Sequence, residues 1–149
     1  MQTHLYLKNG FGKKKKYGNR VNKKYGYLER EDFPIDAKYS FIIMTEVFEH
    51  FALNPVNTMR KLKNMLKTGG KMILTTPNWG HVHIYETWKE MPDAKDVDDE
   101  RYIKLCAIGH SYQYSKEELL EIFDIVGLHV DQYAVTASNH HSFVLSIKD

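Results

Sequence analysis

The chain of 149 residues has few of the patterns that mark membrane, exported or disulfide-stabilised proteins. None of its apolar runs approaches the roughly 20 residues of a membrane-spanning helix, and its N-terminus lacks the apolar segment of a signal peptide. Cys106 is the only cysteine, so no internal disulfide can form, and we interpret it as a small, semi-buried apolar side chain. These absences predict a cytoplasmic protein with no membrane partner. The length fits one domain with a hydrophobic core.

Acidic residues are missing from the first 28 positions, which hold eight lysines and arginines. Because the net charge of the whole chain is +2, residues 29–149 carry −6. We therefore divide the chain into a basic arm, 1–28, and a domain, 29–149. The arm also contains five aromatic residues, which are Tyr6, Phe11, Tyr17, Tyr25 and Tyr27. Cations with stacking rings suit single-stranded nucleic acid, so residues 8–24 are a candidate nucleic-acid contact, and a solvated arm is the alternative.

The domain begins with a strand, a helix and the signals that bound them. A short strand is expected over Tyr25–Arg30. The continuous apolar run Phe41–Thr45 predicts a strand that is buried on both faces of a parallel sheet. Asn54 and Pro55 predict the N-cap and the first turn of an amphipathic helix. We expect Gly69–Gly70 to end this helix in a left-handed turn.

A strand and a long connection come next. Lys71–Thr76 is the predicted strand, and Pro77 ends it because proline cannot donate a hydrogen bond to the ladder. The connection runs over Asn78–Tyr114, a length typical of lids and binding segments. It holds the aromatic residues and histidines Trp79, His81, His83, Tyr85 and Trp88, and the acids Asp93, Asp96, Asp98, Asp99 and Glu100. We expect its aromatic side chains either to grip a substrate or to pin the loop to the core.

The C-terminal third predicts one helix and two strands. A capping box of Ser115 and Glu118 starts the helix, and Gly127 ends it. The expected buried face consists of Leu119, Leu120, Ile122, Phe123 and Val126. His129–Thr136 and Ser142–Ile147 predict an antiparallel pair of strands, joined by an exposed turn over 137–141. The order of elements predicts an α/β fold, with a helix-covered parallel sheet closed by an antiparallel edge hairpin.

Two carboxylates and an imidazole follow the strand at Phe41–Thr45, which marks the edge of an active site. If a helical turn begins directly after Thr45, the side chains of Glu46, Glu49 and His50 share one face. Such a set suits Mg²⁺ or Mn²⁺, and the imidazole favours Mn²⁺. In the alternative without a metal, the acid caps the helix and the histidine bonds the backbone.

Several motifs stand in the order found in one family of enzymes. They are Asp32–Phe33–Pro34–Ile35–Asp36, the strand beginning Tyr39–Ser40–Phe41–Ile42–Ile43, Glu46-x-x-Glu49–His50, Leu66–Lys67–Thr68–Gly69–Gly70, Thr75–Thr76–Pro77–Asn78, and Gly109–His110–Ser111–Tyr112–Gln113–Tyr114–Ser115. From about Asp32 to Val144 the chain thus resembles the C-terminal half of a class I S-adenosylmethionine-dependent methyltransferase of the type 11 kind.

The resemblance implies a Rossmann-like fold and methyl transfer from S-adenosylmethionine to an unidentified oxygen, nitrogen or carbon. It implies cofactor contacts by Asp32, Phe33, Met44, Thr45 and Glu46. Similar families hold a divalent ion for O-methylation with this motif and a later histidine, so the implied metal ligands are Glu46, Glu49, His50 and His110. Without a metal, His50 is the first candidate for the catalytic base and His110 the second. Substrate-side residues are expected within 78–114.

Other parts of that family's fold have no counterpart in this sequence. The first two strands, the glycine-rich cofactor loop and the acid that binds the ribose are missing, and Ser40 stands where aspartate is usual. Gly10-x-Gly12 does not replace the loop, because no third glycine and no helix pattern follow. We therefore predict a truncated methyltransferase domain whose exposed sheet edge associates with a partner chain or with itself. The alternative is a non-catalytic methyltransferase-like module that binds RNA or a protein partner.

Overall fold

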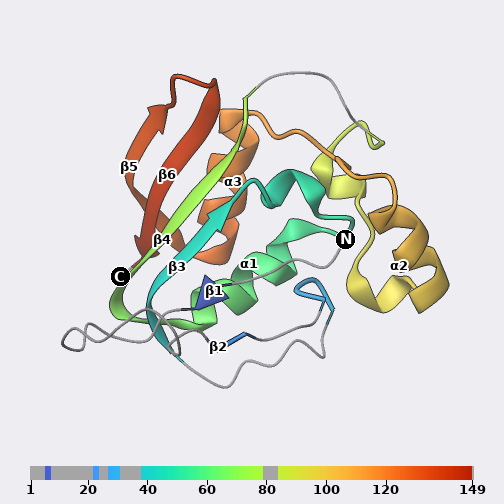
Figure 1. The fold of residues 1–149 in the computed structure, drawn as a ribbon, viewed down its shortest axis with the longest axis horizontal. Coiled ribbons are helices and arrows are strands. Elements are labelled where there is room, and N and C mark those ends of the chain that lie inside the picture. The colour runs from blue at the N-terminus through green and yellow to red at the C-terminus, as the bar shows by residue number, and fades with distance from the viewer. Residues whose placement is uncertain (1–5, 8–21, 24–26, 31–37, 79–83, 149) are drawn as a thin grey trace.

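Four strands form one mixed sheet in the computed structural model, which describes residues 6–7, 22–23, 27–30, 38–78 and 84–148. The strand order is β3-β4-β6-β5, with bounds Tyr39–Thr45 for β3, Leu66–Pro77 for β4, Leu128–Val135 for β5 and His140–Ile147 for β6. β3 and β4 are parallel, whereas β6 runs antiparallel to both β4 and β5. This confirms the predicted α/β sheet with an antiparallel C-terminal hairpin (Figure 1).

Two helices, α1 (Pro55–Asn64) and α3 (Lys116–Val126), pack against one face of this sheet (Figure 1). Two further strands, β1 (Tyr6–Leu7) and β2 (Asn22–Lys23), pair with each other in antiparallel fashion, and β1 lies against β3. The sequence also predicted a short strand over Tyr25–Arg30. This prediction is wrong for residues 27–30, the part that the structure describes. Residues 27–30 form a turn in which the Arg30 amide donates to the Tyr27 carbonyl at 2.9 Å.

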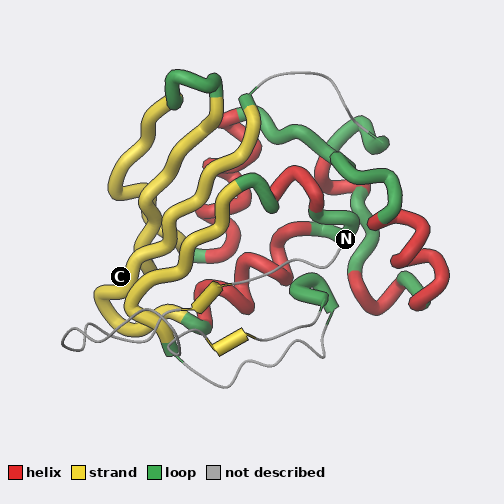
Figure 2. The backbone as a smooth tube through the Cα atoms, viewed as in Figure 1, coloured by secondary structure: helices red, strands yellow, loops and turns green. Residues whose placement is uncertain are grey.

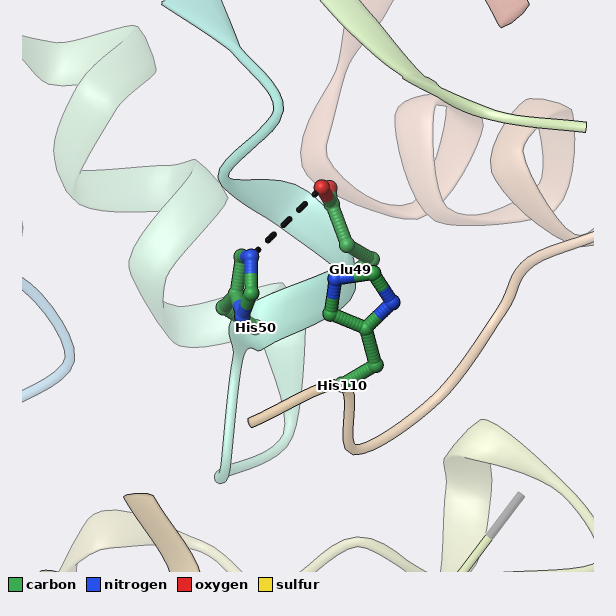
Figure 3. Close-up of side chains that lie close together, drawn as sticks. All are labelled: Glu49, His50 and His110. Carbon is green, nitrogen blue, oxygen red and sulfur yellow. Dashed lines mark ion pairs between the residues drawn. The ribbon is translucent and has the colours of Figure 1, made fainter. Parts of the chain in front are cut away.

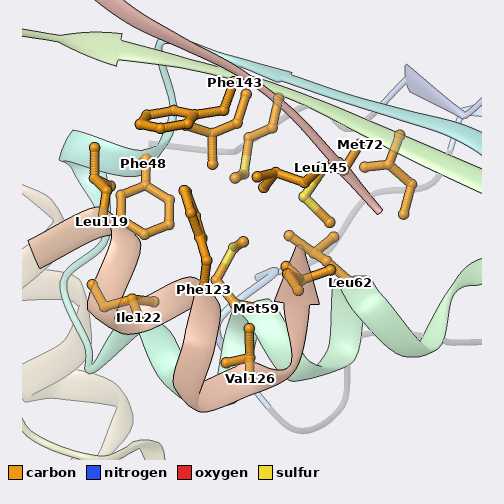
Figure 4. Packing of buried hydrophobic residues seen from close by; sticks show 14 of the residues in the cluster. Phe48, Met59, Leu62, Met72, Leu119, Ile122, Phe123, Val126, Phe143 and Leu145 are labelled. Carbon is orange, nitrogen blue, oxygen red and sulfur yellow. The ribbon is translucent and has the colours of Figure 1, made fainter. Parts of the chain in front are cut away.

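The core lies between the sheet and these two helices. Strand side chains such as Met72, Phe143 and Leu145 meet helix side chains such as Leu62 and Phe123 (Figure 4). The rings of Phe123 and Phe143 pack edge to face with their centroids 5.1 Å apart. All of these side chains are almost fully buried, so this apolar cluster fixes the helices on one face of the sheet.

The opposite face of the sheet is only partly covered within the described chain. Along β3, Ile42 and Met44 are buried, but Phe41 is 48% exposed and Ile43 is 53% exposed. The prediction that this strand is buried on both faces is therefore wrong. The apolar run was typical of a strand between two helix layers, but α1 and α3 both lie on the Ile42 side.

Helix α1 begins as predicted and ends earlier than predicted. The Asn54 side chain caps it by accepting from the Val56 amide at 3.1 Å, and Met65 already forms the C-cap. Gly69, with φ of 72°, and Gly70 belong instead to β4, which begins at Leu66. A Cβ on Gly70 would lie 2.8 Å from the Lys67 carbonyl oxygen, so close backbone approach requires glycine there.

Helix α3 follows its sequence signals closely. Ser115 and Glu118 form the capping box, and Gly127 closes the helix in the left-handed region at φ 75°. The predicted buried face is correct except for Leu120, which is exposed. Local signals at both ends were sufficient here because each acts within one helical turn.

The long connection contains a helix that the sequence analysis missed. α2 spans Asp99–Cys106, and two short 3₁₀ turns, Trp88–Glu90 and Ala94–Asp96, precede it. The Asp98 side chain caps α2 by accepting from the Arg101 amide at 2.7 Å, so part of the acidic run is a helix start. α2 lies at the end of the molecule away from β5 (Figure 2). Cys106 is half-buried, as predicted.

The β5–β6 turn is shorter than predicted. Asn139 lies in the turn with a left-handed φ of 59°, but His140 and His141 already belong to β6. His141 is only 2% exposed, which contradicts its assignment to an exposed turn. The reason is the strand register, because His141 pairs with Thr76 of β4 and shares its buried face.

Candidate active site

The carboxyl ends of β3 and β4 meet at one edge of the sheet and carry the candidate site. Glu46 follows β3 directly, and its amide donates to the Thr75 carbonyl of β4 at 3.0 Å. Its φ of 53° is unusual for a residue other than glycine and turns the chain sharply away from the strand. A short 3₁₀ turn, Phe48–His50, then presents Glu49 and His50 at this edge.

The Glu49 carboxyl group is buried beneath the site, with 1% of the residue exposed. One of its oxygens, Oε2, accepts a hydrogen bond from the Thr76 hydroxyl at 3.1 Å. Its other oxygen, Oε1, lies 3.7 Å from His50 Nε2. Burial raises the pKa of Glu49, and the nearby charge of Glu46 raises it further, whereas hydrogen bonds and His50 oppose the shift.

The two nitrogens of the His50 ring have different surroundings: Nδ1 is hydrogen-bonded to the backbone, and Nε2 faces the site. Nδ1 lies 3.0 Å from the Gly109 carbonyl oxygen, which can only accept, so Nδ1 carries the proton. The lone pair is therefore on Nε2, the nitrogen that faces Glu49 (Figure 3). A histidine fixed by a backbone carbonyl in this way can serve as a base or as a metal ligand.

His110 joins the site from a segment sixty residues further along the chain. Its ring packs edge-on against the His50 ring, with the centroids 4.4 Å apart (Figure 3). One ligand atom from each of Glu49, His50 and His110 lies within 4.8 Å of the others. The backbone explains this meeting, because the Ser111 amide donates to the Glu49 carbonyl at 3.0 Å and anchors the segment.

Glu46 does not join that group of three residues. Its Oε1 accepts from the Thr75 hydroxyl at 3.0 Å, and its Oε2 lies 3.2 Å from His140 Nε2. The helical turn starts at Phe48 and not after Thr45, so Glu46 and Glu49 do not share a helix face as the spacing suggested. The left-handed backbone at Glu46 causes the difference.

The other predicted cofactor contacts have mixed positions. Thr45 is exposed at the same edge, whereas Met44 is buried in the core and presents no side-chain atoms there. Asp32 and Phe33 lie outside the described residues, as do most of the basic arm, the Gly10-x-Gly12 pair, Trp79, His81 and His83. Within the described chain, no helix has the length and apolar character needed to cross a membrane.

Sequence reasoning missed the residues that hold the site together. Thr76, Gly109 and Ser111 position Glu49 and His50 through a hydroxyl, a carbonyl and an amide. His140 reaches Glu46 because β6 starts at the same sheet edge at which β3 ends. The position of His140 beside Glu46 could have been predicted only from the antiparallel pairing of β6 with β4. Local sequence patterns do not show that pairing.

Comparison with known proteins decides the family. The family described as "methyltransferase domain" matches residues 7–133, which include Glu49, His50 and His110. The chain belongs to the methyltransferase-domain family. The class I methyltransferase resemblance seen in the sequence is thereby confirmed. The comparison with curated proteins found no match.

Solved structures show the same fold as this methyltransferase-family chain. LaPhzM is 13% identical with a TM-score of 0.55, and the match covers 87% of this chain and 36% of that one. A SAM-dependent methyltransferase from Aquifex aeolicus is 15% identical with a TM-score of 0.54, over 85% of this chain and 55% of that one. An O-methyltransferase family 2 protein from Planctomyces limnophilus, in complex with apigenin, is 16% identical with a TM-score of 0.52, over 81% and 34%. The chain thus spans about a third to about half the length of these proteins.

Proposed function

We propose that this chain provides the acceptor side of an S-adenosylmethionine-dependent methyltransferase, with the Glu49–His50–His110 group as its reactive centre. The observation that carries the proposal is the position of this group at the carboxyl edge of a parallel strand pair, where ligands bind to sheets of this kind. Structural neighbours with the same fold include CalO1 in its SAH-bound form and PigF with SAH, at 15% and 17% identity.

The residues present fit part of a cofactor site. The partly exposed carboxylate of Glu46 gives this sheet edge a negative charge, which suits a cofactor that carries a sulfonium cation. When bound, S-adenosylmethionine supplies a methyl group whose bond to sulfur breaks as the acceptor atom bonds to carbon. We propose that a partner chain or a second copy of this chain supplies the remaining cofactor contacts.

His50 would act on the acceptor. An acceptor hydroxyl beside Nε2 can pass its proton to this nitrogen while its oxygen takes the methyl group. The Gly109 carbonyl holds Nδ1 protonated, so the lone pair on Nε2 stays available, and Glu49 lies close enough to stabilise the resulting imidazolium. His110, packed against the same ring, would help to hold the imidazole in place.

We also propose that this group binds a divalent ion, which would assist methyl transfer. Glu49 Oε1, His50 Nε2 and a His110 nitrogen are the donor set, and the Gly109 carbonyl bonded to Nδ1 is the kind of outer contact that orients a ligating histidine. Mn²⁺ or Mg²⁺ held there would polarise an acceptor hydroxyl. Because Nε2 has one lone pair, His50 can serve as ligand or as base, but not as both at once.

Calorimetric titration of the full chain tests both parts. We expect S-adenosylmethionine to bind, and we expect Mn²⁺ to bind at least tenfold more weakly to the His110→Ala variant, because one of three ligands is lost. His129→Ala is the matched control, since His129 is exposed on β5 and should change neither titration. A folded chain that binds no S-adenosylmethionine, with or without Mn²⁺, would contradict methyl transfer by this chain alone. Equal Mn²⁺ affinity in the two variants would remove the metal from the proposal.

A further inference from the structure

A pocket lies away from the Glu49–His50–His110 group, between the turn at 27–30 and a part of the chain far along the sequence, residues 94–103. Its volume is about 660 Å³, which is within the range of small-molecule sites. The turn at 27–30, the segment 94–97 and the first turns of α2 form its walls. None of the residues of the Glu49–His50–His110 group lines it.

Aromatic and apolar surfaces form one part of the wall. The Tyr27 and Tyr102 rings meet edge to face with their centroids 5.4 Å apart. Tyr27 is 42% exposed, so part of its ring is available to another planar group. Val97 and Ile103 add aliphatic surface beside these rings. The slot therefore offers flat apolar contact to a ring system.

Arginine and lysine supply the charge of the pocket. The Arg30 guanidinium lies 5.4 Å from the centroid of the Tyr102 ring, and its nitrogens donate to the Val97 carbonyl and to Asp99, each at 2.8 Å. Among the residues that the structure describes, these are the only hydrogen bonds of the Arg30 side chain, and a guanidinium has five N–H groups. Lys95 is exposed at the rim, so two cations face one carboxylate, Asp99. The neighbouring Asp98 does not line the pocket, and its carboxylate is bonded to the Arg101 amide.

The walls are held in place from behind. The Tyr102 hydroxyl donates to the buried Glu29 carboxylate at 3.0 Å, and the other oxygen of Glu29 accepts from the Leu53 amide at 2.8 Å. These bonds connect the turn at 27–30, α2 and the segment before α1. Because these side chains are already ordered, ligand binding loses little side-chain conformational entropy.

We propose that this pocket binds a planar aromatic anion, with the ring between Tyr27 and the aliphatic wall and the anionic group toward Arg30 and Lys95. The arrangement combines ring stacking with a guanidinium that is already oriented by its other bonds, and a planar guanidinium fork suits carboxylate and phosphate groups. The site is independent of the proposed methyl transfer, because it shares no residue with the group at the sheet edge.

Titration of the ¹⁵N-labelled full chain with 2-naphthoate, followed by amide chemical shifts, tests this inference. We expect saturable shifts at Tyr27, Val97 and Ile103, and weaker binding of the neutral 2-naphthamide and of 2-naphthylmethylamine. Lys95→Gln should weaken naphthoate binding about threefold, as loss of an exposed charge does. Tyr27→Ala should weaken it about fivefold through lost ring contact.

The matched control is Lys104→Gln, which removes an exposed charge from α2 outside the pocket and should leave binding unchanged. The inference is overturned if the amide or the amine binds as tightly as the carboxylate. It is also overturned if the shifts do not saturate, or if they centre on Glu49 and His110. No cofactor is present in this titration, so its failure would leave the methyl-transfer proposal intact. Failure of S-adenosylmethionine binding would likewise leave the pocket unaffected.

Discussion

Glu29 and Glu49 have buried carboxyl groups that depend on their immediate partners. Glu49 lies beneath the candidate active site and bonds Thr76. Glu29 lies behind the pocket lined by Tyr27, Arg30 and Tyr102, accepts hydrogen bonds from Leu53 and Tyr102, and has its pKa raised to about 7. Burial is the main cause of the rise, and the hydrogen bonds oppose it only in part. Both groups therefore hold a proton more readily in the folded state than an exposed glutamate does.

We expect Glu29 to make the stability of the fold depend on pH. Its folded pKa of about 7 exceeds the unfolded value of 4.5, so its favourable contribution is complete below pH 4.5 and is lost as the pH rises to about 7. The whole shift corresponds to about 3 kcal/mol. In Glu29→Gln, which cannot ionise, the free energy of unfolding should fall less between pH 5 and pH 8. Urea denaturation at the two pH values measures this.

The matched control for that experiment is Glu100→Gln. Glu100 is exposed on α2 and pairs with Lys104 one turn away, so its replacement should leave the pH dependence as it is in the natural chain. An equal loss of stability with pH in Glu29→Gln and in the unmodified chain would show that Glu29 does not titrate in this range.

At the scale of the element, α3 shows how far local signals reach. Its start at Ser115 and its end at Gly127 could be predicted because each signal acts within one turn of helix. α2 was missed because its pattern lies inside an acidic run, where Asp98 serves as a cap. Gly69 and Gly70 were assigned to a helix end but belong to β4, where Gly70 also approaches the Tyr39 carbonyl of β3, a tertiary contact.

The capping box gives a direct test of α3. Ser115→Ala removes the acceptor of the Glu118 amide and should lower the free energy of unfolding by about 1 kcal/mol. Ser115→Thr keeps a hydroxyl at the same position and should restore most of the loss. Thermal unfolding of the three proteins measures the effect. Equal stability of the alanine variant and the unmodified chain would mean that water replaces the cap without cost.

The candidate site shows what sequence could and could not provide at this scale. Glu49 and His50 could be predicted because they follow a recognisable strand. The meeting with His110 was an expectation from resemblance, and its physical basis, the Ser111 amide on the Glu49 carbonyl, is a tertiary contact. The separation of Glu46 from this group was not visible, because a left-handed φ at a glutamate leaves no signal in the sequence.

At the scale of the whole molecule, the part of the chain that the structure describes covers one face of the sheet and leaves the other partly open. Ile43, Ile73 and Val144 pair in register across three strands, and Phe41 lies on the same face as Ile43. An apolar row of this kind, with Phe41 and Ile43 exposed, favours contact with another protein surface. β3 is at the end of the sheet order, with the short strand β1 against it, and has no charged side chain to discourage pairing with another strand.

We expect the chain to self-associate as its concentration rises, and we expect Phe41→Thr with Ile43→Thr to reduce this association. Threonine suits a strand, so the substitutions remove apolar area without opposing the fold. Sedimentation velocity over a range of concentrations measures the change. Ile125→Thr is the control, because Ile125 is exposed on α3 and lies away from this face. Unchanged sedimentation of the double variant would rule out this face as the contact.

The position of β6 in the sheet has a consequence for synthesis of the protein. β6 lies between β4 and β5, yet it is the last of the four strands to leave the ribosome. Until residues 140–147 emerge, the hairpin cannot form and β5 has no partner strand in the described sheet. Met72 and Leu74 of β4 then also lack their cross-strand partners, Leu145 and Phe143. A nascent chain at that stage presents unfinished apolar surface, and surface of this kind promotes aggregation. The parallel pair β3–β4 can form first, and the centre of the sheet is completed last.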